Sequence, residues 1–133
     1  YPEPASAYSD AALQQALVDA LLPQLVTQLD TPAAWGQTLS GGEQQRLAMA
    51  RVFLKQPAWV FADEATSALD EAAENTLYKR LLAQVERGRG AIISIAHRPT
   101  VAAFHAQRWT LQAQPEGASA RYTVQATTAQ TTP

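Results

Sequence analysis

Three titratable side chains stand directly behind two apolar runs of the sequence. Asp63 and Glu64 follow the run 58–62, and His97 follows the run 91–96. Ligands of open parallel sheets bind beyond the carboxyl ends of the strands, so we expect these side chains to meet at one edge. Carboxylates there can hold Mg²⁺ on nucleotide phosphates and accept a proton from attacking water, and an imidazole can polarise the phosphate. An acidic pair after an apolar strand also occurs in α/β proteins without such chemistry, so the pattern alone leaves both interpretations open.

A second candidate for phosphate binding is the segment Ser40, Gly41, Gly42. Small residues at the start of a helix leave backbone N–H groups open at the positive end of the helix dipole. Ser40 and Glu43 also have the spacing of a capping box, and a capped helix after a turn needs no ligand. Capping does not require the two glycines, which lower helix propensity by about 1 kcal/mol each. We therefore favour access to a phosphate as the reason for the glycine pair.

Periodic apolar residues predict the elements that must position these groups. Apolar stripes predict amphipathic helices over 10–21 and 70–87, and the capping residues predict a further helix over 40–55. The runs 58–62 and 91–96 predict short strands buried on both faces, with the helix between them as the crossover of a parallel pair. The expected α/β fold also includes a short helix over 23–29, a hairpin of 108–112 with 121–125, and a disordered tail over 126–133.

The composition restricts the possible partners. The chain has 133 residues, a net charge of −2 and no cysteine. This balance leaves no basic surface for a nucleic-acid backbone, and the lack of thiols excludes disulfides and thiolate metal sites. The apolar runs are far shorter than the ~18 residues needed to span a bilayer. We therefore expect no nucleic-acid partner and no membrane-spanning segment within these residues.

Four motifs, in this order along the chain, resemble those of the ABC ATPases. They are the signature motif over 39–46 (Leu-Ser-Gly-Gly-Glu-Gln-Gln-Arg), the Walker B strand over 59–64, the D-loop over 67–70 and the switch histidine at His97. Two positions depart from the family pattern, since Glu43 stands where glutamine is commoner and Ala62 where leucine is usual. Neither departure removes a catalytic group.

The resemblance implies a role for each motif residue. ATP and Mg²⁺ would lie between two nucleotide-binding domains, so that the signature motif of one domain contacts the ATP held by the other. The implied roles are Mg²⁺ orientation by Asp63, general base for Glu64, γ-phosphate sensing by His97, γ-phosphate contact by Ser40, Gly41 and Gly42, and coupling across the interface by Asp70. The implied partners are a second nucleotide-binding domain and a transmembrane domain fused upstream, at the cytoplasmic face of a bacterial inner membrane.

The resemblance covers the C-terminal part of one ABC ATPase domain. It assigns residues 1–125 to that part, with a helical subdomain over 1–56 and a core over 57–125. The phosphate-binding loop G-x-x-x-x-G-K-[ST] is absent, because neither of the two lysines is followed by serine or threonine. Together with the start at Tyr1, this predicts a fragment with a partial P-loop NTPase-like fold that is inactive alone. We expect its exposed sheet edge to favour aggregation.

Within the family, Ala65 after the acidic pair is similar to exporter-type domains. Five aromatic or histidine positions resemble a narrower branch of the family: Trp35, Trp59, Tyr78, Phe104 and His105. That branch comprises bacterial inner-membrane proteins related to peroxisomal fatty-acyl transporters and to vitamin B12, bleomycin and antimicrobial-peptide transporters. One alternative is a soluble ABC-type ATPase, which would call for coiled-coil heptads or basic arms that this sequence lacks. The other is a non-catalytic ABC-like binding module, which the presence of Glu64 and His97 disfavours.

Overall fold

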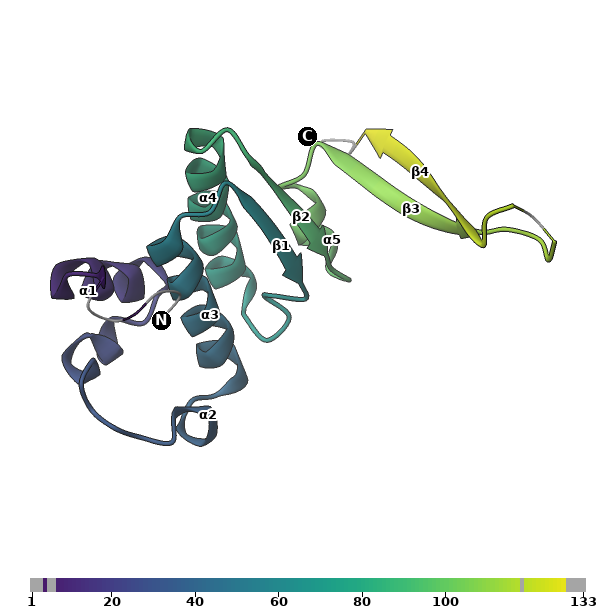
Figure 1. The fold of residues 1–133 in the computed structure, drawn as a ribbon. Coiled ribbons are helices and arrows are strands. Elements are labelled where there is room, and N and C mark those ends of the chain that lie inside the picture. Colours follow the sequence, from purple (N-terminus) through teal and green to yellow (C-terminus); the bar gives the residue numbers. More distant parts are fainter. Residues whose placement is uncertain (1–3, 5–6, 118, 129–133) are drawn as a thin grey trace.

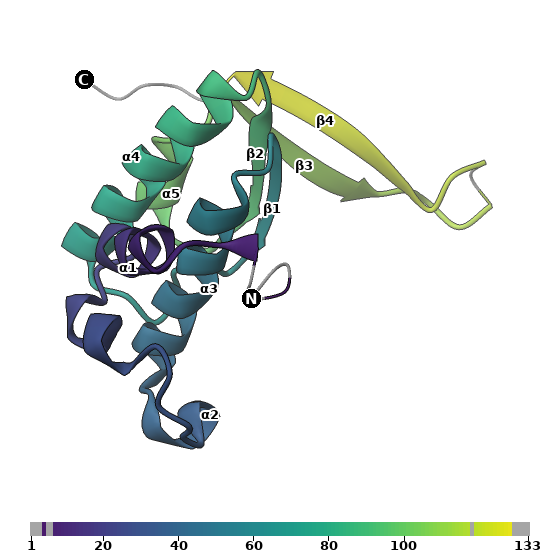
Figure 2. The same cartoon turned by 60° about the vertical axis from the view of Figure 1, so that its left-hand side comes forward.

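The structure is a computed structural model and describes residues 4, 7–117 and 119–128. In chain order its elements are α1 (Asp10–Asp19), the 3-10 helix η2 (Pro23–Gln28), α2 (Trp35–Thr38), α3 (Gly41–Lys55), β1 (Trp59–Asp63), α4 (Glu71–Arg87), β2 (Ala91–Ile95), α5 (Pro99–Ala102), β3 (Gln107–Ala113) and β4 (Tyr122–Thr128). Helices α3 and α4 lie on one side of strands β1 and β2, and the β3–β4 hairpin extends away from this body (Figures 1 and 2). The predicted mixture of helices, a parallel pair and a hairpin is confirmed.

Strands β1 and β2 pair in parallel, and helix α4 connects them as predicted. Asp63 lies opposite Ile95, so both strands end at the same edge of the sheet. The apolar stripe of α4 shares one core with the covered face of the two strands and with helices α1 and α3. The buried residues of this core are Leu17, Ala20, Leu22, Met49, Ala50, Phe53, Val60, Leu69, Ala73, Leu77, Tyr78, Leu81, Val85, Ile92 and Val101.

Only one face of β1 is covered within the described part of the chain. Val60 and Ala62 are buried, whereas Trp59 and Phe61 are 59% and 77% exposed. The prediction that this strand is buried on both faces is therefore wrong for the described residues. The reason is that successive side chains alternate between faces, and the described helices cover one face only. An apolar run shows what a strand can bury, but it does not show which segment lies against each face.

The hairpin pairs β3 with β4 in antiparallel fashion, from Gln107 opposite Thr128 to Ala113 opposite Tyr122. Every residue of both strands is exposed. The predicted disordered tail from residue 126 is corrected here, because residues 126–128 complete β4. They pair with the first residues of β3, so their backbone groups belong to the ladder. Residues 129–133 of the predicted tail lie outside the described residues.

The segment after β2 is attached to α4 through Tyr78. This side chain is 1% exposed, its hydroxyl lies 3.2 Å from Ser94 Oγ, and its ring stacks on Phe104 at 5.0 Å between centroids. Burial raises the pKa of the Tyr78 phenol, because the charged form would lose hydration. The short helices α2 and α5, which the sequence patterns did not predict, have four residues each and fall below the length at which periodicity is informative.

Candidate functional site

The carboxyl edge of the β1–β2 pair brings together Glu64 and His97, as the strand order predicts. Glu64 follows β1 directly, and His97 lies two residues beyond the end of β2. Glu64 Oε1 and His97 Nε2 are 2.9 Å apart, while the two side chains remain 47% and 86% exposed. A carboxylate and an imidazole in contact at an open edge can orient each other and still be reached by a ligand or water.

Glu64 has an unusual backbone conformation, with φ at 45° in the left-handed region. For a residue with a Cβ this conformation is disfavoured, and it persists only where surrounding contacts hold it. Three hydrogen bonds do so here. The Glu64 N–H donates to Ile95 O at 2.9 Å, and the Glu64 carbonyl accepts from the Ser67 N–H at 3.1 Å and from Gln45 Nε2 at 3.2 Å. These bonds from β2, α3 and the following loop hold the Glu64 backbone, and with it the direction in which the side chain leaves the chain.

Asp63 ends β1 on the open face of the sheet, where it is exposed. Residues 4, 7–117 and 119–128 contain no group of three or more His, Cys, Asp or Glu side chains that could hold a metal ion. A lone carboxylate is nevertheless a suitable single ligand for Mg²⁺, which commonly takes one or two carboxylates and completes its shell with phosphate oxygens and water. The donor set therefore fits a nucleotide-bound Mg²⁺ better than a metal held by protein alone.

Ser40 begins helix α3 with the capping box that the sequence predicts. Its Oγ accepts from the Glu43 N–H at 3.3 Å, and the Glu43 carboxylate accepts from the Ser40 N–H at 3.0 Å and from its hydroxyl at 2.9 Å. The backbone and hydroxyl bonds from Ser40 lower the pKa of the Glu43 carboxyl below its usual value. The first hydrogen bond of the helix runs from the Gln44 N–H to Ser40 O. The N–H groups of Gly41 and Gly42 lie before it and therefore take no part in the bonding within the helix.

The two glycines of this segment have different surroundings. A Cβ added to Gly42 would lie 3.0 Å from Ala68 O, whereas one added to Gly41 would meet only Ala68 Cβ at an ordinary 3.8 Å. Close packing of α3 on the 64–70 loop therefore explains Gly42 without a ligand, which corrects the idea that access alone accounts for the pair. For Gly41, the described residues impose no such packing restriction, and access to its N–H stays a prediction.

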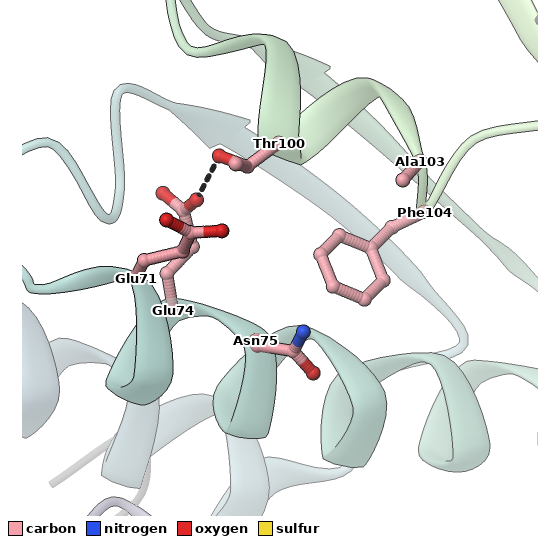
Figure 3. A pocket seen from close by; sticks show the side chains of 6 residues that line it. All are labelled: Glu71, Glu74, Asn75, Thr100, Ala103 and Phe104. Atoms are coloured by element: carbon pink, nitrogen blue, oxygen red, sulfur yellow. Dashed lines mark hydrogen bonds between the residues drawn. The ribbon is translucent and has the colours of Figure 1, made fainter. Parts of the chain in front are cut away.

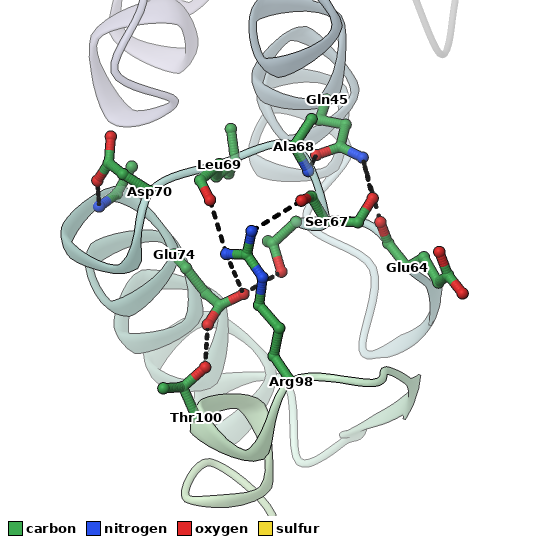
Figure 4. Close-up of polar contacts among 11 residues, drawn as sticks. Gln45, Glu64, Ser67, Ala68, Leu69, Asp70, Glu74, Arg98 and Thr100 are labelled. Carbon is green, nitrogen blue, oxygen red and sulfur yellow. Dashed lines mark hydrogen bonds and ion pairs between the residues drawn. The ribbon is translucent and has the colours of Figure 1, made fainter.

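The loop over 64–70, which carries Glu64, is held from both sides (Figure 4). On one side Gln45 forms hydrogen bonds with Glu64 O, Ser67 Oγ and the Ala68 N–H. On the other side Arg98 donates to Ser67 O at 2.8 Å and to Leu69 O at 2.6 Å. Asp70 ends the loop as the N-cap of α4, where it accepts from the Ala73 N–H at 2.8 Å. The structure thus gives Asp70 a capping role, and its coupling role across an interface stays a prediction.

Comparison with known proteins places these residues in a family. The family model described as ABC transporter matches residues 7–67. An uncharacterised ABC transporter ATP-binding protein of Synechocystis sp. is 43% identical over 117 residues, which cover 86% of this chain and 17% of that protein. A protein of the same description from Haemophilus influenzae is 41% identical over 112 residues, or 84% of this chain and 19% of that protein. The chain belongs to the ABC transporter ATP-binding family.

Other members of the family match a shorter part of the chain. The mitochondrial ATP-dependent permease MDL1 of Saccharomyces cerevisiae is 55% identical over 65 residues, which are 49% of this chain and 9% of that protein. This ABC-family chain spans less than a fifth of the length of the first relatives that it matches. No helix among its described residues is long and apolar enough to cross a membrane.

Sequence reasoning missed a buried carboxylate of this ABC-family chain, Glu74, which is 1% exposed. It accepts hydrogen bonds from Thr66 Oγ1 at 2.8 Å and Thr100 Oγ1 at 2.5 Å, and it lies 3.7 Å from Arg98 Nη1. A signal was present, because Glu74 continues the apolar stripe of α4 by one turn, three residues before Leu77. A carboxylate in that position predicts burial and therefore partners.

A small pocket lies beside Glu74, between α4 and α5 (Figure 3). Its lining residues are Glu71, Glu74, Asn75, Thr100, Ala103 and Phe104. None of the predicted site residues lines it, and its lining carries two carboxylates and no Lys or Arg side chain, which disfavours a phosphate there. The candidate site is therefore the open edge at Glu64 and His97, not this pocket.

Proposed function

We propose that this chain supplies the general base and the signature residues for ATP hydrolysis in an ABC transporter. The observation that carries the proposal is the 2.9 Å contact between Glu64 Oε1 and His97 Nε2 at the edge where β1 and β2 end. A carboxylate in contact with an imidazole beyond parallel strands is suited to act on a phosphate bound at that edge. The α/β arrangement is consistent with part of a P-loop NTPase-like fold.

In this proposal each residue acts through its own chemistry. Glu64 accepts the proton of the attacking water, and His97 holds the Glu64 carboxylate and senses the γ-phosphate. Asp63 would hold Mg²⁺ through a bridging water, and the charge of the bound ion would neutralise phosphate oxygens. Ser40, with the N–H groups of Gly41 and Gly42, contacts the γ-phosphate of an ATP molecule held by a second domain.

The phosphates of ATP also need a loop that the 133 residues do not contain. No G-x-x-x-x-G-K-[ST] sequence is present in the chain. We therefore propose that another segment or chain supplies this loop and that the 133 residues alone do not hydrolyse ATP. Two nucleotide-binding domains would close on ATP, as the open position of Ser40 at the start of α3 supports, and would drive an exporter-type transmembrane domain. The site would then lie on the cytoplasmic face of the membrane.

The test replaces Glu64 by glutamine in the chain joined to, or assembled with, the segment that carries the phosphate loop. Glutamine preserves shape but cannot accept the proton, so we expect ATP turnover to fall by about 10² to 10⁴-fold while ATP binding persists. Glu86→Gln is the matched control, since Glu86 is an exposed carboxylate at the far end of α4. Equal turnover of the Glu64→Gln variant and the unchanged protein would contradict the proposal and favour a non-catalytic ABC-like module.

A further inference from the structure

The loop over 64–70 joins the proposed base to helix α4, and its conformation depends on one glutamine of helix α3. Gln45 Nε2 donates to Glu64 O at 3.2 Å and to Ser67 Oγ at 2.9 Å, and Gln45 Oε1 accepts from the Ala68 N–H at 2.9 Å. A primary amide has two donor hydrogens and one acceptor oxygen, and all three functions are used here (Figure 4). Carboxylate, hydroxyl and ammonium side chains cannot reproduce this set of bonds.

These bonds act where the backbone needs support. Glu64 has its φ at 45°, and the carbonyl that Gln45 binds belongs to the same residue. The opposite side of the loop is held by Arg98, which bonds to Ser67 O and Leu69 O. Because Arg98 follows His97 directly, the segment that carries the imidazole also holds the loop that carries the base. Release of either side would free Glu64 to relax from the left-handed conformation and turn its side chain.

Gln45 lies on the helix that begins with the signature residues. Ser40 caps α3, and Gln45 is five residues further along, about 7.5 Å at 1.5 Å per residue. The packing of Gly42 on Ala68 O adds a second close contact between the same helix and the same loop. A shift of the α3 N-terminus would therefore pull on the loop through Gln45 and Gly42 together.

We propose that Gln45 is a positioning residue for Glu64: it ties the phosphate-facing helix α3 to the loop that aims the base. This inference rests on the proposed function, because it needs Glu64 to act in hydrolysis. It adds a route between two sites, since the helix that contacts one ATP molecule through Ser40 fixes the base that acts on another. Occupation of the first site would then hold Glu64 of the same chain in its working direction.

The test measures steady-state ATP hydrolysis in the same assembled protein over a range of ATP concentrations, which gives kcat and KM separately. Gln45→Ala removes all three bonds, and Gln45→Glu keeps only an acceptor for the Ala68 N–H. We expect both variants to lower kcat by about 10- to 100-fold with KM within about twofold of the unchanged protein, because small misplacement of a catalytic group has effects of this size. Gln15→Ala is the matched control, since Gln15 bonds to Asp19 within α1 and does not touch the loop.

A double variant separates positioning from a general loss of structure. If Gln45 acts through Glu64, Gln45→Ala has no further effect on the residual rate of the Glu64→Gln protein, because the base that it positions is already absent. An equal fold-loss from Gln45→Ala in both backgrounds overturns the inference. So does an unchanged kcat in Gln45→Ala when Glu64→Gln is slow, and that result leaves the proposed function intact. An unchanged rate in Glu64→Gln instead overturns the proposed function itself.

Discussion

The contact between Arg98 and Glu74 offers a quantitative prediction about the stability of this chain. Glu74 is buried at 1% exposure, whereas the Arg98 side chain is 41% exposed, and their charged atoms are 3.7 Å apart. Two threonine hydroxyls already donate to the carboxylate. Arg98→Met keeps much of the apolar stem, but it removes the positive charge and both hydrogen bonds to the loop carbonyls.

The size of the effect follows from these contacts. Charge-assisted hydrogen bonds contribute about 1.5–3 kcal/mol each when buried, and the solvent at Arg98 reduces the two carbonyl bonds to about 1 kcal/mol each. Loss of one partner of a buried pair costs about 3–5 kcal/mol, and the retained hydroxyl donors and the exposure of Arg98 lower this to about 1–2 kcal/mol. We therefore expect Arg98→Met to reduce the free energy of unfolding by about 3–4 kcal/mol.

A double-mutant cycle isolates the charge pair from the carbonyl bonds. Glu74→Gln removes the charge and should reduce the free energy of unfolding by about 1–2 kcal/mol. In the Glu74→Gln background Arg98→Met should cost only about 2 kcal/mol, because no buried charge is left without its partner. The expected coupling between the two sites is thus about 1–2 kcal/mol, with the double variant more stable than the sum of the single changes predicts.

The assay is urea unfolding of the 133-residue chain, followed by far-ultraviolet circular dichroism. Arg108→Met is the matched control, since Arg108 lies in the exposed strand β3, and it should change the free energy of unfolding by less than about 0.5 kcal/mol. Additivity of the two changes within about 0.5 kcal/mol would refute the reasoning. It would mean that solvent at Arg98 removes the interaction and that the threonine hydroxyls suffice for Glu74.

Two further predictions concern the local conformation of the chain. Gly90→Ala should lower the free energy of unfolding by about 3 kcal/mol or more, because the added Cβ would lie 1.6 Å from the backbone oxygen of Ala58. Gly36→Ala is the control, because a Cβ there would meet nothing within 4 Å. Thermal unfolding of the two variants measures the difference. The lowered pKa of Glu43 adds stability that is present above its usual value of 4.5 and lost as the pH falls through the lowered value. Urea unfolding at about pH 6 and about pH 3 should thus show a smaller loss in Glu43→Gln than in the unchanged chain, and an equal loss would contradict the assigned cause.

Several parts of the fold and site could be predicted because their causes are local. Ser40 and Glu43 form their capping box within four residues of chain, and the apolar stripe of α4 repeats at helical spacing. The meeting of Glu64 with His97 also followed from pattern, because parallel strands of equal length end at the same edge. The end of β4 was less predictable, because residues 126–128 contain no large apolar side chain that would mark a strand, and their extended conformation comes from pairing with β3.

Most partners of Gln45 and Arg98 could not be predicted, because they are backbone groups of a loop about twenty to thirty residues away in the chain. Backbone carbonyls and N–H groups leave no mark in a sequence, and which of them a long side chain reaches depends on how α3 and the segment after β2 pack on the loop. Glu74 is intermediate. Its position on the apolar stripe indicates burial, but only the fold identifies the threonines and the arginine that accompany it.

The sequence by itself determined the chemical groups of this ABC-family chain and the strand ends that carry them: a carboxylate pair, a histidine and a serine–glycine helix start. Only the tertiary structure decided how Glu64 is aimed, because its left-handed backbone is held by bonds from β2, α3 and its own loop. The tertiary structure also decided that no described segment covers one face of β1, and that Gly42 is needed for packing on Ala68. The physical reason is common to all three: composition and spacing specify local geometry, whereas distances between segments arise only when those segments pack together.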